Sequence, residues 1–176
     1  DGGVIAVNGA EDAEAAAEQV AIWREAGLTV IPSVFASISD VIGDDLRETH
    51  IAALVDVVVS NDYDGIDIDY EGFPAETRED FSLFIEGLAE ALHAEGRITS
   101  VTVHAKTTDE GAWDGARAQD WTRLSAAADM FRIMTYDYSN RNEPPGPISP
   151  TPWVLDVLAY AETVVDDMSK VYMGLH

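Results

Sequence analysis

Short apolar runs rich in valine and isoleucine alternate along the chain with longer segments of helical periodicity. The apolar runs predict six strands, which are Gly3–Val7, Leu28–Phe35, Gly65–Tyr70, Ile98–Ala105, Met130–Tyr136 and Val171–Leu175. The segments between them predict five helices, which are Glu11–Ala26, Leu46–Ser60, the stretch from Thr77 to Gly96, Gln119–Ala127 and Trp153–Val165. This alternation is typical of βα units that surround a parallel sheet.

The third predicted helix has the clearest signals. Thr77 is suited to its N-cap, with Asp80 three positions later, and Gly96 is suited to its end. Its apolar residues fall on one face at helical spacing, namely Phe81, Phe84, Ile85, Leu88 and Leu92. This face should pack against the sheet. Among the tryptophans, we expect Trp23 in the core and Trp121 and Trp153 as helix anchors.

Six successive βα units fit either a (β/α)8 barrel or a doubly wound open sheet. No G-x-G-x-x-G fingerprint follows any predicted strand, so nothing favours dinucleotide binding. A complete barrel takes about 250 residues and at least roughly 200. A chain of 176 residues with six predicted strands therefore indicates one α/β domain over residues 1–176 that is a barrel short of about two strands.

Composition narrows the partners. The 33 acidic side chains against 10 basic ones give a formal charge of -23, which repels nucleic acid and anionic membranes. No stretch reaches the about 18 consecutive apolar residues of a membrane helix. With no cysteine, the chain has no disulfide, thiolate metal site or cysteine nucleophile. Most of the carboxylates are expected on the solvated surface.

The most informative segment is Asp64–Glu71, which is the third predicted strand with one residue on either side of it. Strand side chains alternate between faces, so Asp67, Asp69 and Glu71 should project together on the face opposite Ile66 and Ile68. Burying neighbouring carboxylates costs several kcal/mol unless they share protons or find partners. Their proximity should raise at least one carboxyl pKa and so provide a protonated acid near neutral pH. The carboxyl end of a barrel strand is where barrel enzymes place their chemistry, and Glu71 lies there.

Two metal sites compete with this interpretation. The segment Ser60–Glu71 can be aligned with an EF-hand calcium loop, although Ser60 stands at the first ligand position and Asp67 at an apolar one. Alternatively, the three carboxylates of one strand could hold Mg²⁺, but no further acidic or basic residues of a phosphate-handling site are evident. Both are weaker than the acid-base interpretation.

At these residues the sequence resembles the family-18 glycoside hydrolases, the chitinase family. Asp64–Glu71 matches the family signature D-G-x-D-x-D-x-E in full. A second family element, Met-x-Tyr-Asp at the end of the sixth barrel strand, is matched by Met134, Tyr136 and Asp137. The resemblance covers nearly the whole chain. It implies a (β/α)8 barrel present from its second strand to its seventh, with the first and eighth missing.

The resemblance also implies a mechanism and a role for each residue. Glu71 would protonate the glycosidic oxygen, and the 2-acetamido oxygen of the sugar would attack the anomeric carbon, giving an oxazolinium ion and net retention. Asp69 would orient the acetamido N–H, and Asp67 would share a proton with Asp69. Tyr136 would donate a hydrogen bond to the acetamido carbonyl, and Asp137 would support the sugar and the nearby acids. No cofactor is required.

The implied partner is a polysaccharide or oligosaccharide that contains N-acetylglucosamine, bound by a monomer that is secreted or in the cell envelope. Several stretches look most similar to the peptidoglycan and spore-cortex branch, but Asp67 and Asp137 are the residues of typical chitinases, so both substrates stay open. Trp113 is a candidate sugar platform and Met134 a candidate substrate contact. His104 and Lys106 are expected to be structural. A lectin on the same fold is the alternative, although lectins of the family usually lose the acid that Glu71 provides.

Overall fold

In the computed structural model, residues 13–36, 42–139 and 145–175 are described, with side chains from residue 17 onward. Five strands form one parallel sheet: β1 (Ser33–Ala36), β2 (Gly65–Tyr70), β3 (Ile98–His104), β4 (Met130–Met134) and β5 (Val171–Gly174). The helices are α1 (Ala13–Glu25), α2 (Arg47–Ser60), α3 (Arg78–Ala94), α4 (Asp114–Arg117), α5 (Trp121–Ala127) and α6 (Thr151–Val164), with the 3₁₀ turns Ala75–Thr77 and Met168–Lys170. The α/β class is confirmed.

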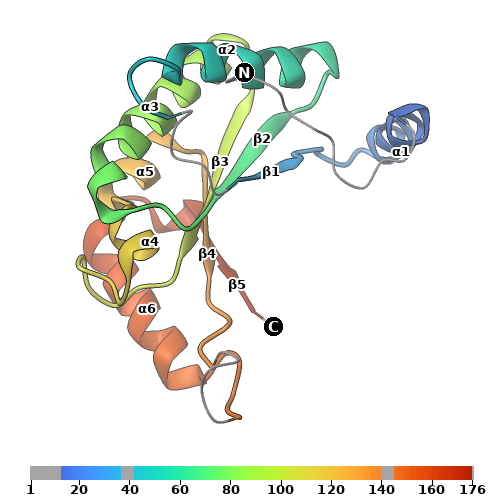
Figure 1. Cartoon of the computed structure of the whole chain (residues 1–176). Helices are drawn as coiled ribbons and strands as arrows, with labels where there is room; N and C mark the ends of the chain where they lie inside the picture. The colour runs from blue at the N-terminus through green and yellow to red at the C-terminus, as the bar shows by residue number, and fades with distance from the viewer. Residues whose placement is uncertain (1–12, 37–41, 140–144, 176) are drawn as a thin grey trace.

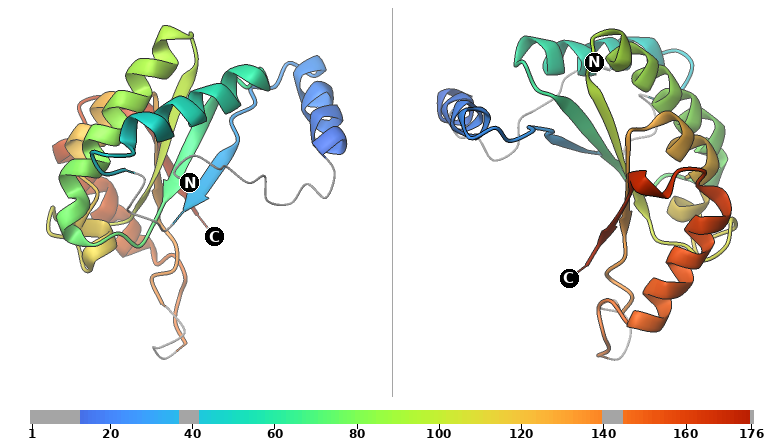
Figure 2. Two further views of the ribbon diagram at one scale, coloured as in Figure 1. Left: turned by 45° about the horizontal axis from the view of Figure 1, so that its top comes forward. Right: turned by 180° about the vertical axis from the view of Figure 1, so that it is seen from behind.

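Strand order follows chain order from β1 to β5, and each strand is parallel to its neighbours. A doubly wound sheet reverses its strand order at a switch point, whereas a barrel adds strands in one direction. The observed order therefore favours the barrel over the open-sheet alternative. The helices α2, α3, α5 and α6 cover one face of the sheet, and α1 lies apart from them beyond β1 (Figures 1 and 2).

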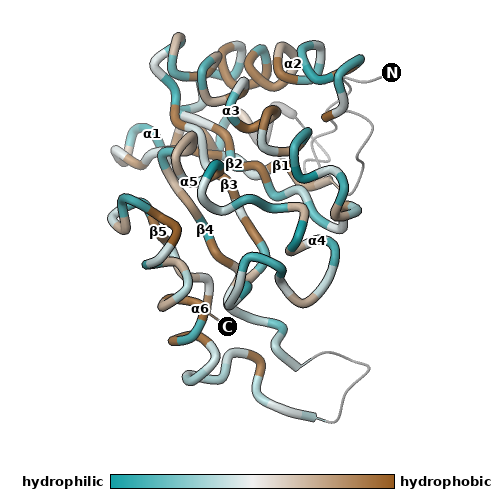
Figure 3. Tube along the Cα trace, turned by 90° about the vertical axis from the view of Figure 1, so that its left-hand side faces the viewer, coloured by the Kyte–Doolittle hydropathy of each residue, from teal (hydrophilic) through white to brown (hydrophobic). Residues whose placement is uncertain are grey.

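The core fills the space between these helices and the sheet. All five apolar residues predicted on one face of α3 are fully buried. They meet the outward side chains of the strands, namely Ile66, Ile68, Tyr70, Val101, Val103, Phe131 and Ile133. Hydrophobic stretches run along the central strands behind the helices (Figure 3). Trp121 is buried as expected, but Trp23 on α1 is 43% exposed, so its placement in the core was wrong.

Several element ends agree with the sequence signals. Gly27 follows α1 with a φ of 75°, and Gly96 follows α3 with a φ of 67°, the left-handed conformation that glycine adopts without strain. Thr77 is the N-cap of α3, yet its side chain donates to the Pro74 carbonyl oxygen and caps no helical N–H. The first predicted strand, Gly3–Val7, lies outside the described residues. Within the described part of the chain, no helix is both long and apolar enough to cross a membrane.

The start of β2 is fixed by two residues of the motif. Asp64 accepts a hydrogen bond from the Val30 N–H at 2.7 Å, and its own N–H donates to the Val30 carbonyl. Gly65 lies so close to β3 that a Cβ there would come within 2.2 Å of the Ile98 carbonyl oxygen. These first two residues of the Asp64–Glu71 segment therefore hold the strand in place, which aims the acids that follow.

Candidate active site at the carboxyl ends of the strands

Asp67 and Asp69 share one face of β2, as predicted, and the Glu71 side chain lies close enough to form a hydrogen bond with Asp69. Asp67 and Asp69 line a hollow of about 510 Å³ on the face opposite the helices, and Glu71 follows directly after the strand. Asp67 is buried, whereas Asp69 and Glu71 are half-buried. Burial of the three acids thus decreases toward the carboxyl end of the strand, and the last acid is open to a bound molecule.

Asp67 is held by hydroxyl groups from both neighbouring strands. It accepts hydrogen bonds from Ser33 at 3.0 Å, from Ser100, and from Thr102 at 2.9 Å. Ser33, Asp67 and Ser100 are register partners and so form one row across the sheet. The Arg132 guanidinium of β4 lies 3.8 Å from the same carboxylate. These contacts surround both carboxylate oxygens of Asp67 with donors and so fix the orientation of its side chain.

The sequence analysis did not identify Ser33, Ser100, Thr102 or Arg132 as partners of Asp67. The signal that could have found them is the face of the sheet to which each position belongs. Each lies on the same face as Asp67 in an adjacent or next-adjacent strand, at positions where a buried parallel strand is normally apolar. Polar residues at such positions indicate a buried polar partner.

Asp69 and Glu71 form a coupled pair. Burial, the charges of Glu71 and Asp67, and a hydrogen bond with Glu71 raise the pKa of Asp69 to about 6. Burial also raises the pKa of Glu71, with the charge of Asp137 adding to the shift and the hydrogen bond from Asp69 opposing it. One proton shared by two carboxyls is therefore retained closer to neutral pH than by either isolated acid. One oxygen of Asp69, Oδ1, is buried without a hydrogen-bond partner.

Tyr136 and Asp137 follow β4 and lie beside this pair. Burial raises the pKa of Tyr136, and the charges of Asp69, Glu71 and Asp137 act in the same direction. The Tyr136 hydroxyl therefore keeps its proton at neutral pH and can donate a hydrogen bond. Asp137 has a φ of 58°, a conformation uncommon outside glycine and often found at functional sites. The turn after β4 thus places Tyr136 and Asp137 near the acids of β2.

A groove of about 560 Å³ leads away from Glu71. Two pairs of rings form its aromatic walls. The Trp113 and His104 rings are 4.5 Å apart between centroids, and the Tyr138 and Trp153 rings are 5.1 Å apart between centroids. Trp113 is 46% exposed, as a sugar platform requires. Met134 and Tyr136 line both the groove and the hollow that holds Asp69. All seven residues predicted for the site therefore line one or both of two spaces that share Met134 and Tyr136 in their walls.

Other candidate residues have different surroundings. His104 lines the groove, and burial lowers the pKa of its imidazole to about 4, so the ring is neutral at physiological pH. Lys106 is buried away from the groove and donates to the Gln119 carbonyl oxygen at 2.7 Å. Trp153 lies near the start of α6 and contributes to the groove as well. The structural role expected for Lys106 is confirmed, whereas His104 has a place at the site.

The calcium-loop alternative is contradicted by the geometry. A calcium loop would bring Asp62, Asp64 and Glu71 around one centre, but the strand β2 separates Asp64 from Glu71 by roughly 20 Å of extended chain. Asp62 is instead paired with Arg24 and Arg97. Among the residues that the structure describes, no group of three or more histidine or acidic side chains is arranged to hold a metal ion.

Comparison with known proteins agrees with this geometry. The chain is 30% identical over 122 residues to "Uncharacterized glycosylase YvbX" of Bacillus subtilis (strain 168). The matched region covers 69% of this chain and 35% of that protein. It is 31% identical over 111 residues, 62% of the chain, to the "Cortical fragment-lytic enzyme" of the same organism, covering 25% of that protein. The chain thus spans about a third or less of these relatives.

The fold is also similar to that of a solved enzyme structure. The crystal structure of a chitinase from Chromobacterium violaceum ATCC 12472 superposes with a TM-score of 0.90 at 26% identity. The match covers 99% of this chain and 56% of the chitinase chain. Residues 25–176 match the family described as "Glycosyl hydrolases family 18". The chain therefore belongs to glycosyl hydrolase family 18.

Proposed function

We propose that the protein is a retaining glycoside hydrolase that cleaves β-linked N-acetylglucosamine polysaccharide, with Glu71 as the general acid. The observation that carries the proposal is the coupled pair of Asp69 and Glu71 at the inner end of an aromatic groove. Both pKa values are raised, and Glu71 faces the groove while Asp69 faces the hollow. A carboxyl with a raised pKa beside a sugar-sized groove is suited to protonate a glycosidic oxygen.

In the proposed reaction, Glu71 transfers its proton to the glycosidic oxygen as the bond from that oxygen to the anomeric carbon breaks. The 2-acetamido oxygen of the same sugar attacks the anomeric carbon and forms an oxazolinium ion, so no protein nucleophile is needed. Asp69 accepts the acetamido N–H, and Tyr136 donates its hydroxyl to the acetamido carbonyl. Glu71 then removes a proton from the water that opens the ring, which gives net retention.

The surroundings of the acids support these roles. The unpartnered Oδ1 of Asp69 is an acceptor that a bound acetamido N–H would satisfy. Asp67 is held next to Asp69 by its three hydroxyl donors, and its charge raises the pKa of Asp69. Negative charge at this place favours a cationic intermediate. Trp113 offers an exposed ring to the apolar face of a sugar. Every step uses side chains of this chain and requires no cofactor.

The substrate class rests on the relatives. A chitinase and a cortical fragment-lytic enzyme are among the similar proteins, and their names refer to chitin and to cortical fragments as the material acted on. We therefore extend the proposal to chitin or peptidoglycan as substrate and to a secreted or envelope-bound monomer. The groove residues within the described part of the chain, which are aromatic, acidic or neutral, suit uncharged acetamido sugars.

Release of a fluorophore from N-acetylglucosamine oligomers by the whole protein that contains this chain tests the proposal. Glu71→Gln should lower kcat by about 10²-fold or more, the scale of a general acid. Glu76→Gln, at an exposed glutamate nearby, is the matched control and should keep wild-type activity. A wild-type protein that binds the oligomers and releases no fluorophore would instead establish the alternative, a lectin.

A further inference from the structure

The side chain of Gln119 lies between the ends of the two strands that border the groove. It is fully buried, at 1% exposure, and it comes from the short segment between α4 and α5. Its Oε1 accepts a hydrogen bond from the His104 N–H at 2.7 Å, and its Nε2 donates to the Tyr70 carbonyl oxygen at 3.4 Å. Tyr70 is the residue before Glu71. One side chain therefore links the backbone at the proposed acid to the backbone at His104.

The pairing of β2 with β3 ends below this point. The two strands pair from Gly65 opposite Ile98 to Ile68 opposite Val101, although β2 continues to Tyr70 and β3 to His104. Beyond Ile68, β2 stays paired with β1, and β3 stays paired with β4. The strands thus separate from each other before their carboxyl ends, and both Glu71 and His104 line the groove where they separate.

A glutamine side chain is chemically suited to this gap. Its carboxamide has the same acceptor and donor as a peptide group, so it can replace one rung of the ladder while holding the strands farther apart. Only one orientation of the amide satisfies both the His104 N–H and the Tyr70 carbonyl. A buried N–H and a buried carbonyl would otherwise lose their partners at the edge of the site.

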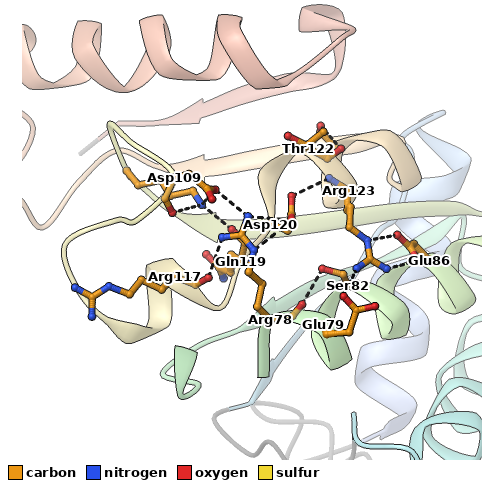
Figure 4. A network of polar contacts seen from close by, with 12 residues as sticks. Arg78, Glu79, Ser82, Glu86, Asp109, Arg117, Gln119, Asp120, Thr122 and Arg123 are labelled. Atoms are coloured by element: carbon orange, nitrogen blue, oxygen red, sulfur yellow. Dashed lines mark hydrogen bonds and ion pairs between the residues drawn. The ribbon is translucent and has the colours of Figure 1, made fainter. Parts of the chain in front are cut away.

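The segment that carries Gln119 is itself fixed by charged groups. The buried Lys106 ammonium donates to the Gln119 carbonyl oxygen at 2.7 Å and lies 5.6 Å from the centre of the Trp121 ring. Arg78 of α3 donates to the Arg117 carbonyl oxygen at 3.2 Å and pairs with Asp120 at 2.9 Å. Figure 4 shows Gln119 beside Arg78, Arg117 and Asp120 of this network. The chain on both sides of Gln119 is therefore anchored to the helix layer, which leaves Gln119 little freedom to withdraw.

We propose that Gln119 is a positioning residue that acts as a wedge between β2 and β3 and sets the place of Glu71 relative to His104 and Trp113 in the groove. The proposal rests on the function proposed for Glu71. It goes beyond that function because Gln119 is not among the residues that line the groove. A displacement of a catalytic group by about 1 Å lowers the rate by up to roughly 10²-fold. A residue that fixes the place of Glu71 therefore affects the rate without touching the substrate.

The test compares two variants of the whole protein with a control. Gln119→Leu removes both hydrogen bonds and should lower kcat by at least about 10-fold with KM within about twofold of the wild type. Gln119→Glu should keep activity at acidic pH, where a protonated carboxyl accepts from His104 and donates to Tyr70, and should lose kcat as pH rises. The control is Arg123→Gln, which removes the ion pairs between Arg123 of α5 and the residues Glu79 and Glu86 of α3. It should leave kcat unchanged.

A second measurement separates this proposal from the proposed function. Titration of the Glu71 carboxyl by ¹³C NMR should show a pKa in Gln119→Leu different from that in the wild type, whether or not the wild type cleaves sugars. An inactive wild type with this shift would overturn the function and keep the wedge. The wedge would be overturned if Gln119→Leu had the kcat of the wild type per folded molecule. If Gln119→Leu does not fold, a wild-type kcat in Gln119→Glu across the pH range would overturn it in the same way. An unchanged titration of Glu71 would also overturn it.

Discussion

The two faces of the central sheet treat side chains of the same strand in opposite ways. On the helix-covered face, Ile66, Ile68 and Tyr70 of β2 are 0–1% exposed and meet the apolar side of α3. On the other face, Asp67 and Asp69 of the same strand lie beside hydroxyls and a guanidinium and line a hollow. Since apolar burial is the main stabilising term in folding, the first face should govern stability and the second chemistry.

The acid face is itself divided. Asp67 accepts hydrogen bonds from Ser33, Ser100 and Thr102, whereas Asp69 keeps one buried oxygen without a partner and a pKa raised to about 6. A satisfied carboxylate resembles a structural element, and an unsatisfied one is available to a ligand. The difference shows that position on a face alone does not assign a role, because two acids two residues apart have opposite hydrogen-bond surroundings.

The largest effect on stability should come from the helix-covered face. Phe84 is fully buried, stacked 5.7 Å from the Tyr70 ring and 5.4 Å from the His50 ring between centroids. Phe84→Ala should lower the free energy of unfolding by about 3–5 kcal/mol, since it leaves a cavity in the core. Urea denaturation measures this, with Leu155→Ala at an exposed position as the control. A tenfold change in kcat per folded molecule would show that the two faces are not separable.

The reverse result is expected for the unsatisfied acid. Asp69→Asn keeps the shape of the side chain but removes the charge, and it should lower kcat by about 10²-fold, equivalent to roughly 2.7 kcal/mol of activation free energy. The free energy of unfolding at pH 7 should not fall, because the ionised carboxyl is poorly solvated in the folded state. Steady-state kinetics and urea denaturation of the same preparation measure both quantities. Loss of stability without loss of kcat would assign Asp69 a structural role.

The sequence was informative where local physics decides the structure. The bounds of β2 were predicted to the residue and those of α2 to within one residue, because turn residues flank regular apolar patterns there. The alternation of side chains along a strand was also enough to predict Asp67 and Asp69 on one face. The one-turn helix α4 was not predicted, since four residues are too few to show a helical period.

The contacts that complete the site could not be found in this way. Ser33 and Ser100 bond Asp67 from positions 34 and 33 residues away, and Gln119 bonds Tyr70 from 49 residues away. Such partners follow from the register of parallel strands, which a single sequence does not specify. Trp23 was wrong for a related reason, because an apolar residue on a helix is buried only where another element covers that side of the helix.

A smaller effect should distinguish the two kinds of buried hydroxyl. Ser100→Ala removes one of the three hydroxyl donors of Asp67. Hydrogen bonds to charged groups contribute about 1.5–3 kcal/mol. Because Ser33 and Thr102 remain, the free energy of unfolding should fall by about 1.5 kcal/mol, the lower end of this range. Ser125, buried in α5, donates only to the Thr122 carbonyl at 3.3 Å, so Ser125→Ala should cost less. Thermal or urea denaturation compares them. An equal loss would contradict the description of Asp67 as a charged anchor.

The smallest effect is a pH dependence that isolates Asp69. The pKa of its carboxyl rises from 3.8 to about 6 on folding, so the folded state binds its proton more tightly than the unfolded state does. The resulting stabilisation is fully present below about pH 4 and is lost as pH rises through about 6.

Asp69→Asn has no proton to lose at this site. Its advantage over the wild type in free energy of unfolding should therefore grow between pH 4 and 6 and level off above, at about 1 kcal/mol after allowance for solvent screening of a half-buried group. Urea denaturation across this range measures the difference. Glu71 titrates in both proteins, so a difference that stays constant with pH would show that Asp69 ionises at its ordinary value.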